Sequence, residues 1–229
     1  MKNWANLLLI TMLVLLQNMA VESQGDEPRA FYFIQQWLPS YCNQEGTPCC
    51  YPTTGKPGAN FTIYGLWPYN DNGVSLENCP GASFDVGPLK AIESMLEQEW
   101  PTFTCPQIGR KFWLHEWNKH GACSKSVLEE IQYFEAALNL KNKFNILQIL
   151  GKANIYPDNE LYPLETIKDV LFQATGLQPL IYCNRDSEEN SQIWQILLCV
   201  DKTGMELVNC SNVPDGQREC TSTIKFPSY

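Results

Sequence analysis

The chain has 229 residues, which is enough for one domain or at most two small ones. Hydrophobic residues make up 44% and aromatic residues 12%, so the chain can build a packed core and disorder is disfavoured. The formal net charge of −9 argues against a broad groove for a long nucleic-acid duplex, because such grooves are usually basic. A small pocket for a nucleotide is compatible with this charge.

The N-terminal segment is typical of a signal peptide. Lys2 precedes an apolar run at residues 7–16, and the small or polar residues Ala20, Ser23 and Gly25 follow. The run is shorter than the roughly 20 apolar residues of a membrane span, although a short N-terminal anchor is the alternative reading. We expect a signal peptide at residues 1–24, cleaved between Ala20 and Gly25, and a mature domain at residues 25–229. No later segment is long and apolar enough to cross a bilayer. The product is therefore expected to be soluble, without a membrane partner, and either secreted or vacuolar.

The cysteines behind this segment predict a disulfide framework. An even number after a signal peptide is typical of five bridges in an oxidising compartment. Metal binding is the alternative, but the chain has only two histidines and no CxxC motif. We therefore expect no metal site and no cofactor. Spacing alone does not give the pairing of the ten cysteines, which are Cys42, Cys49, Cys50, Cys79, Cys105, Cys123, Cys183, Cys199, Cys210 and Cys220.

Strand patterns lie toward the two ends of the chain and helical patterns lie between them. Alternation predicts early strands at 31–37 and 61–66, separated by turn residues. Apolar residues at helical spacing predict helices at 85–100, 111–120, 127–150 (one or two helices) and 163–174. Further strands are expected at 178–183, 193–200, 206–210 and 223–226. This order favours one disulfide-rich α+β domain, with a mainly antiparallel central sheet and flanking helices.

The richest chemical cluster lies on the second of these predicted helices. With 3.6 residues per turn, His115 and Lys119 point within about 40° of one another, and so do Glu116 and His120. Phe112 falls on the same face. A neutral imidazole can accept a proton while a second imidazolium and an ammonium stabilise an anion. The alternative is an ordinary solvated helix face with structural aromatic residues.

A second segment makes the pattern specific. Residues 61–68 read FTIYGLWP, and residues 115–121 read HEWNKHG. In this order the two segments resemble the active-site segments of the ribonuclease T-two (T2) family, and the similarity to its plant S-like branch extends over essentially the whole mature chain. The resemblance implies an α+β fold with a central antiparallel sheet. It also implies five disulfides, which would be Cys42–Cys49, Cys50–Cys105, Cys79–Cys123, Cys183–Cys220 and Cys199–Cys210.

Members of this family cleave single-stranded RNA without a metal, through a 2′,3′-cyclic phosphate. Carried over by position, the resemblance implies that His120 is the general base acting on the 2′-hydroxyl. His115 would bind phosphate, and Glu116 and Lys119 would stabilise the charged transition state. Single-stranded RNA or nucleotides are thus the expected partners, and the sequence leaves the oligomeric state open.

Three further residues are implied in binding the substrate. Trp67 would pack near the phosphate, and Gln36 and Phe112 would help receive a base, since an aromatic face stacks on any nucleobase. Thr102 stands where some relatives carry an asparagine that reads uracil, so the base preference is left open.

One position departs from the family pattern. The family's second catalytic histidine, the acid that protonates the leaving oxygen, corresponds to Tyr64. A phenol has a pKa near 10 against about 6.5 for imidazole, and losing a positioned general acid typically lowers the rate by on the order of 10² to 10⁴. There are two alternatives: Tyr64 is a sequencing or allelic oddity in an active enzyme, or it is a repurposed acid whose pKa is lowered by Lys119 or another cation.

These observations favour a homologue with little or no RNA cleavage and a storage or defence role. The alternatives are an active acid endoribonuclease and a module that binds nucleotides or RNA without cutting. A glycosylation sequon begins at Asn60 and a poorer one at Asn209.

Overall fold

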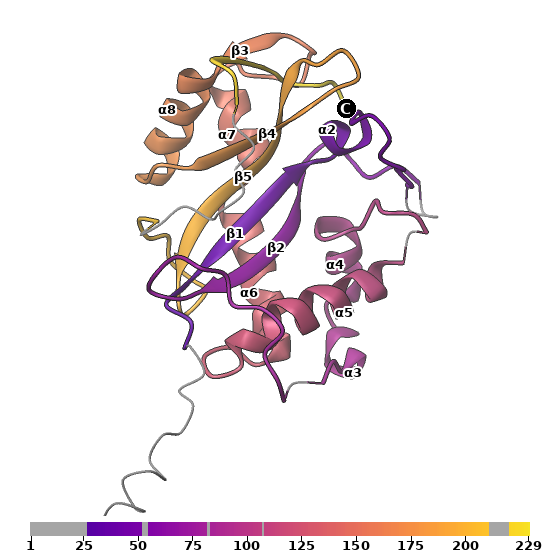
Figure 1. The fold of residues 1–229 in the computed structure, drawn as a ribbon, viewed down its shortest axis with the longest axis vertical. Helices are drawn as coiled ribbons and strands as arrows, with labels where there is room; N and C mark the ends of the chain where they lie inside the picture. The colour runs from indigo at the N-terminus through magenta and orange to yellow at the C-terminus, as the bar shows by residue number, and fades with distance from the viewer. Residues whose placement is uncertain (1–26, 52–54, 82, 107, 211–219) are drawn as a thin grey trace, which may run out of the picture.

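The structure is a computed structural model that describes residues 27–51, 55–81, 83–106, 108–210 and 220–229. The predicted signal peptide lies outside these residues. A twisted sheet runs through the centre, with the helices between residues 86 and 143 around its lower part and those between 146 and 175 beside its upper end (Figure 1). No helix of the described residues is long and apolar enough to span a membrane. The same residues contain no group of three His, Cys, Asp or Glu side chains that could hold a metal ion.

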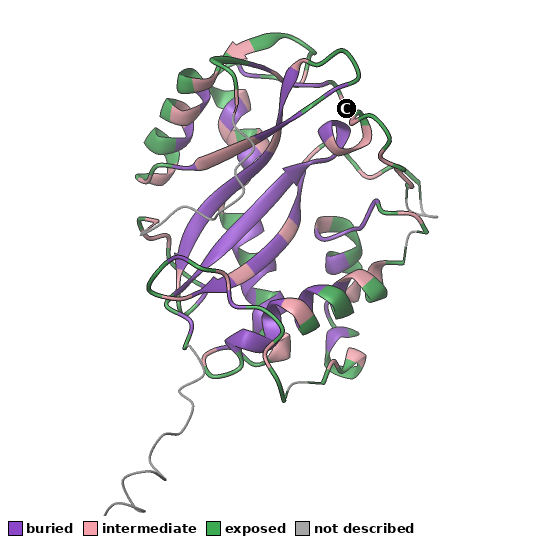
Figure 2. Cartoon of the chain, in the orientation of Figure 1, coloured by how far each residue is buried: buried purple, intermediate pink, exposed green. Residues whose placement is uncertain are grey.

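The sheet is mainly antiparallel, as predicted. Its order is β2 (Phe61–Tyr69), β1 (Ala30–Trp37), β5 (Ser191–Asp201), β6 (Thr223–Lys225) and β3 (Leu161–Pro163), and β4 (Leu180–Arg185) also pairs with β5. Each pairing is antiparallel except that of β5 with β6. Strands β1, β2 and β5 are buried over most of their length (Figure 2). The two predicted active-site segments thus meet at the β2 side of a buried sheet.

Alternation along the strands separates two faces of the sheet. On one face, Phe31 and Phe33 of β1 join Ile63 and Leu66 of β2 in a core that α6 (Glu130–Lys143) covers. On the other, Tyr32 and Ile34 belong to a smaller cluster that Tyr64 and Trp67 contact. The sheet therefore buries one face fully and turns the other toward the candidate site.

The remaining helices are α2 (Leu38–Cys42), α3 (Val86–Leu89), α4 (Glu93–Glu99), α5 (Gly109–Lys119), the 3₁₀ helix η1 (Gly121–Ser124), α7 (Ile146–Lys152) and α8 (Leu164–Thr175). The helix predicted at 85–100 is two helices. Asp85 caps the first by accepting from the Gly87 N–H, but Ile92 N bonds Leu89 O, an i→i−3 bond that tightens the chain before α4 starts. A similar division falls at Asn145, whose side chain caps α7.

The strand predicted at 206–210 is wrong. Only an isolated bridge between Leu207 and Val200 forms there. The Asp201 carboxylate accepts from the N–H groups of Met205 and Glu206, so a turn takes the place of a strand ladder. The short elements β3 and α2 were not predicted.

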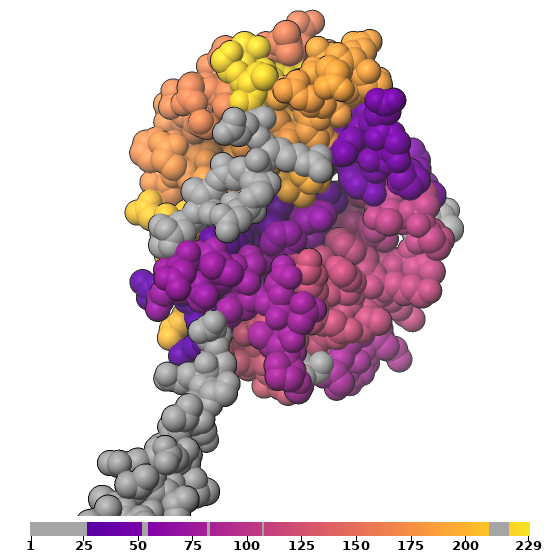
Figure 3. Space-filling view, viewed as in Figure 1, coloured from indigo at the N-terminus to yellow at the C-terminus, as the bar shows by residue number. Residues whose placement is uncertain are grey.

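Five disulfides join the described elements. They are Cys42–Cys49, Cys50–Cys105, Cys79–Cys123, Cys183–Cys220 and Cys199–Cys210, the same pairs that the family resemblance implies. Two of them, Cys50–Cys105 and Cys79–Cys123, tie loops against the two ends of α5. The middle of the chain packs into the lower half of the molecule and the C-terminal part into the upper half (Figure 3).

Candidate active site

A β-bulge places Tyr64. In the β1–β2 register, Ile34 lies opposite Gly65 and Gln35 lies opposite Ile63, so Tyr64 is an extra residue with no partner in the register. A bulge shifts the alternation of the strand by one residue. Ile63 and Leu66, three positions apart, therefore both face the main core, while Tyr64 and Trp67 both contact the cluster on the other face.

Gly65, inside this bulge, permits a close approach of side chains to the backbone. A Cβ atom at this position would lie 2.8 Å from Glu116 Oε2 and nearer still to Trp67 Nε1. Real Cβ atoms do not come so close to other heavy atoms. Glycine at position 65 therefore lets Trp67 and Glu116 meet directly over strand β2.

A cavity of about 390 Å³ opens beside Tyr64, between β2, α5 and the loop that precedes α5. We call it the aromatic pocket, because four of its lining residues are Tyr41, Tyr64, Phe103 and Phe112. The other lining residues are Gln36, Thr102, Thr104, Pro106, Ile108, Lys111, His115 and Glu116. Pockets for small ligands are typically lined in this way, by apolar and aromatic groups with a few polar ones.

Gln36 contributes a carboxamide group to the wall of the pocket. The side chain is only 5% exposed, and its Oε1 has no hydrogen-bond partner in the described part of the chain. A buried acceptor of this kind is destabilising unless a ligand or water donates to it. The pocket thus combines aromatic faces with a polar carboxamide in its wall, a lining that suits a nucleobase.

Glu116 lies at the inner wall of the pocket and is only 3% exposed. Its Oε2 accepts a hydrogen bond of 3.0 Å from Trp67 Nε1. Burial raises the pKa of Glu116 to about 7, against the opposing effects of the Trp67 hydrogen bond and the Lys119 charge. The carboxyl group is therefore partly protonated near neutrality and largely protonated at pH 5 to 6.

His120 lies behind Trp67. The two rings are stacked, with centroids 4.4 Å apart and planes inclined by 16°, and His120 is only 1% exposed. Burial, with the nearby charges of Lys119 and His115, lowers the pKa of His120 to about 3. The imidazole is consequently neutral above that pH, as a base must be, yet it is not among the described residues that line the pocket.

Lys119 has an acidic partner that sequence reasoning missed. Its Nζ lies 3.6 Å from Glu77 Oε1, and the same oxygen lies 4.0 Å from His120 Nδ1. The Cys79–Cys123 disulfide and the bond from Asn78 N to Lys119 O hold this loop against the end of α5. The ammonium is thus paired outside the aromatic pocket.

The Tyr64 phenol is a weak acid in this setting. Burial and the neighbouring Glu116 carboxyl both raise its pKa above the ordinary value of 10, and Tyr41 adds to the effect. Its ring also lies 5.6 Å from that of Trp67. The shift is opposite in direction to the one that a repurposed tyrosine acid needs.

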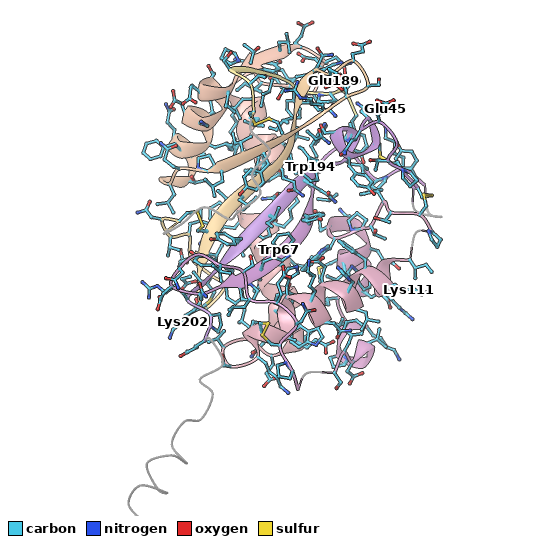
Figure 4. All side chains as sticks on the ribbon, in the orientation of Figure 1. Glu45, Trp67, Lys111, Glu189, Trp194 and Lys202 are labelled. Atoms are coloured by element: carbon cyan, nitrogen blue, oxygen red, sulfur yellow. A yellow bond between two sulfur atoms is a disulfide. The ribbon has the colours of Figure 1, made fainter. Side chains whose placement is uncertain are left out.

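The structure brings most of the predicted site residues together, in two layers. Gln36, Tyr64, Phe112, His115 and Glu116 line the aromatic pocket, as does Thr102. Trp67 connects them to His120, and Lys119 lies beyond it. Figure 4 shows Trp67 over the central strands and Lys111 toward the outer edge of α5. Besides Glu77, the sequence did not predict six residues that line the pocket, namely Tyr41, Phe103, Thr104, Pro106, Ile108 and Lys111. The Cys50–Cys105 pairing was the available signal for the loop at 102–106.

The chain is similar to known proteins over most of its length. The model of the Ribonuclease T2 family matches residues 29–210. Ribonuclease 1 of Arabidopsis thaliana is 43% identical, over 98% of this chain and 98% of its own length. Extracellular ribonuclease LE of Solanum lycopersicum is also 43% identical, over 99% of each chain.

Solved structures and a more distant relative extend the comparison. The crystal structure of RNase NT in complex with 5′-AMP matches with a TM-score of 0.82 and 45% identity, covering 87% of this chain and 98% of the other. A ribonuclease-like storage protein of Panax ginseng is 31% identical, over 82% of this chain and 78% of its own. On the strength of the matched family model, these identities and the five disulfides, the chain belongs to the Ribonuclease T2 family.

Proposed function

We propose that this protein binds nucleotides or single-stranded RNA in the aromatic pocket and cleaves RNA little or not at all. The observation that carries the proposal is Tyr64 itself. It lines the pocket, and burial raises the pKa of its phenol. The resemblance in the sequence assigns this position to the second catalytic histidine of the family. A general acid contributes about 10² to 10⁴ in rate when its pKa lies near the working pH, and this phenol is far from that range.

Loss of the histidine also removes positive charge from the site. An imidazolium at position 64 would face the phosphate at pH 5 to 6, whereas a phenol is neutral there. His120 is neutral at the same pH, because its pKa is about 3, and Lys119 is paired with Glu77. Fewer cations are therefore available to stabilise the negative charge of a phosphorane transition state than the predicted helix face suggested.

The binding half of the proposal rests on the part of the site that remains intact. Phe112, Tyr41 and the Gln36 acceptor offer stacking and one hydrogen bond to a base, and His115 is exposed at the pocket for a phosphate. The related RNase NT has been crystallised with 5′-AMP, which supports a nucleotide as the ligand class here.

The role of such a protein is part of the same proposal. We expect a secreted or vacuolar storage or defence protein, made with a signal peptide at residues 1–24. A relative named a ribonuclease-like storage protein supports storage, and one named extracellular supports secretion. N-terminal sequencing of the mature protein tests the signal peptide. A blot of separate organs tests storage, because a trace protein in every organ would contradict bulk accumulation.

The second candidate function is an active acid endoribonuclease that forms a 2′,3′-cyclic phosphate. The relatives at 43% identity are named ribonucleases, which is the observation in its favour. In that reading His120, His115, Glu116 and Lys119 keep the roles implied by the resemblance, and Tyr64 supplies the proton.

One set of assays separates the two candidates. Wild type, Tyr64→His and Tyr64→Phe are incubated with single-stranded RNA at pH 5 to 6. We expect little cleavage by wild type, the same by Tyr64→Phe, and at least a roughly tenfold gain in Tyr64→His. Wild-type turnover within tenfold of an ordinary family member, lost in Tyr64→Phe, would instead establish the active enzyme.

Binding is measured separately, by calorimetric titration of 5′-AMP into wild type and Gln36→Leu. We expect binding by wild type and a weakening of about 1–3 kcal/mol in the variant, because the base edge loses its acceptor. A wild type that shows no binding, or an unaffected variant, would contradict the nucleotide-binding proposal whatever the cleavage assay gives.

A further inference from the structure

A second cavity lies away from the aromatic pocket and shares no lining residue with it. It opens between α4 and α6 and has a volume of about 690 Å³. We call it the amide cleft, because five carboxamide side chains line it, namely Asn60, Gln98, Asn139, Asn142 and Asn145. Its volume is in the range of roughly 300–1,000 Å³ that holds small ligands. Nothing in the proposed function uses this cleft.

The lining of the amide cleft has a specific chemical character. A carboxamide can donate and accept at once, so several of them together match a ligand rich in hydroxyl and acetamido groups. Glu99 and Glu135 add acceptors, while Ile92, Met95 and Leu138 form an apolar edge. Met95 is 48% exposed although it is a large apolar side chain. Sugars present both kinds of surface, since their rings have polar rims and apolar faces.

The lining of the cleft includes an ion pair with one buried partner. Lys141 is only 3% exposed, and its Nζ lies 3.6 Å from Glu99 Oε2. Lys141 and Glu99 neutralise one another, and Glu135 adds one negative charge, so the cleft has no net positive charge that would select a phosphate. The carboxamides, which outnumber the charged groups, favour a polar ligand with many hydroxyl and amide groups.

Asn60 is the residue that identifies this ligand. It begins the sequon Asn60-Phe61-Thr62, in which the side-chain nitrogen of the asparagine is the site of glycosylation. Its Oδ1 accepts from the Phe61 N–H at 2.9 Å, and Nδ2 has no partner among the described residues. A sugar joined to Nδ2 therefore starts inside the wall of the cleft.

We propose that Asn60 carries an N-linked glycan and that the amide cleft holds its first sugars. The donor is a lipid-linked oligosaccharide diphosphate. Asn60 Nδ2 forms a bond to the anomeric carbon, the bond from that carbon to the diphosphate oxygen breaks, and the diphosphate leaves with the pair of electrons while Nδ2 loses one proton. Thr62 is only 2% exposed and lies in β2, so the transfer precedes the pairing of this strand.

The chain offers a matched control glycan at a site with no such cleft. Asn72 lies in an exposed turn before Val74, which is 56% exposed, and Val74→Thr creates a second sequon there. In the Asn60→Gln background, Val74→Thr carries a glycan in open solvent. Both glycans are joined through the same bond and are cleaved by the same amidase.

The experiment uses the full chain secreted by a plant cell. Intact mass is measured before and after a peptide N-glycosidase, acting on native and on denatured protein. Wild type should lose a glycan that Asn60→Gln lacks. Native wild type should release its glycan at least about tenfold more slowly than the control variant releases its own, which corresponds to shielding by ~1.4 kcal/mol. After denaturation the two glycans should be released at the same rate.

A third variant tests whether the cleft causes the protection. Gln98→Ala with Asn139→Ala removes two exposed amides from the lining, and native release should become several-fold faster. The proposal is overturned by an unmodified Asn60, by equal release rates from the two native glycans, or by protection that the double variant leaves unchanged.

Discussion

The Trp67 indole contacts Glu116 of α5 and also His120, the residue that directly follows this helix. Its ring stacks on His120 with centroids 4.4 Å apart, and its N–H donates to Glu116 Oε2 at 3.0 Å. One side chain of β2 therefore holds a buried carboxyl group and a buried imidazole in fixed positions. The bulge at Tyr64 and the missing Cβ at Gly65 make this contact possible.

The double contact predicts the effect of Trp67→Phe. A phenyl ring keeps the stack on His120 but leaves the buried Glu116 carboxylate without its donor. We expect the free energy of unfolding to fall by about 1–3 kcal/mol at pH 8, where Glu116 is charged, and by less at pH 5. Urea titrations at both pH values measure it. In a Glu116→Gln background the pH-dependent part should vanish, and a loss of the same size at both pH values would count against the hydrogen bond.

The two shifted pKa values predict opposite pH dependences. The pKa of Glu116 rises from 4.5 to about 7 on folding, so the native state holds an extra proton and its stability falls as the pH rises through this interval. The shift corresponds to on the order of 3 kcal/mol. We expect Glu116→Gln to gain stability relative to wild type between pH 4 and pH 8. A constant difference across this range would contradict the raised pKa.

The pKa shift of His120 changes the stability with pH in the opposite direction to that of Glu116. Its pKa falls from 6.5 to about 3, so its contribution is fully present above pH 6.5 and is lost as the pH decreases toward 3. His120→Asn should therefore flatten the decline in unfolding free energy between pH 6.5 and pH 3, as measured by chemical denaturation. A decline as steep as that of wild type would mean that the imidazole is protonated in the folded state.

Much of the fold follows from local patterns. Alternating or apolar residues placed β1 and β2, although both strands are buried over most of their length, and helical spacing placed α5, whose buried residues lie on one face. The family resemblance then indicated which residues face the pocket. Short elements such as α2 and β3 carry too few residues to show a period.

The rest of the site depends on contacts between distant segments. Glu77 contacts Lys119 because the Cys79–Cys123 disulfide holds the loop that contains Glu77 against the end of α5. No spacing in the sequence predicts this ion pair. The burial of His120 behind Trp67 likewise depends on the bulge at Tyr64, three residues before Trp67 in β2. The strand predicted at 206–210 is reduced to one bridge, because Asp201 at the end of β5 accepts from the N–H groups of Met205 and Glu206 and stabilises a turn there.

The close approach at Gly65 predicts a steric effect. Gly65→Ala places a Cβ within contact distance of Trp67 and Glu116, so both must move. We expect a loss of about 1–3 kcal/mol in unfolding free energy, together with a change in tryptophan fluorescence. Gly58→Ala is the control, because a Cβ there meets nothing within 4 Å. Equal stability of the two variants would show that the contact between β2 and α5 adapts without strain.

The pairing of Glu77 with Lys119 predicts that restoring the general acid at position 64 does not by itself restore full RNA cleavage. In a Tyr64→His background, Glu77→Gln frees the Lys119 ammonium for a phosphate while the amide still fits beside His120. We expect RNA cleavage at pH 5 to 6 to rise by a further threefold to tenfold or so, where tenfold equals about 1.4 kcal/mol in the barrier. With Tyr64 in place the same change should do little, because no proton reaches the leaving oxygen and the two effects are not additive.

Glu45→Gln is the control. It makes the same change in net charge at an exposed position away from α5, so it separates the effect of the local ion pair from that of the overall charge. Slower cleavage in Tyr64→His with Glu77→Gln would mean that Glu77 positions His120 rather than withholding Lys119.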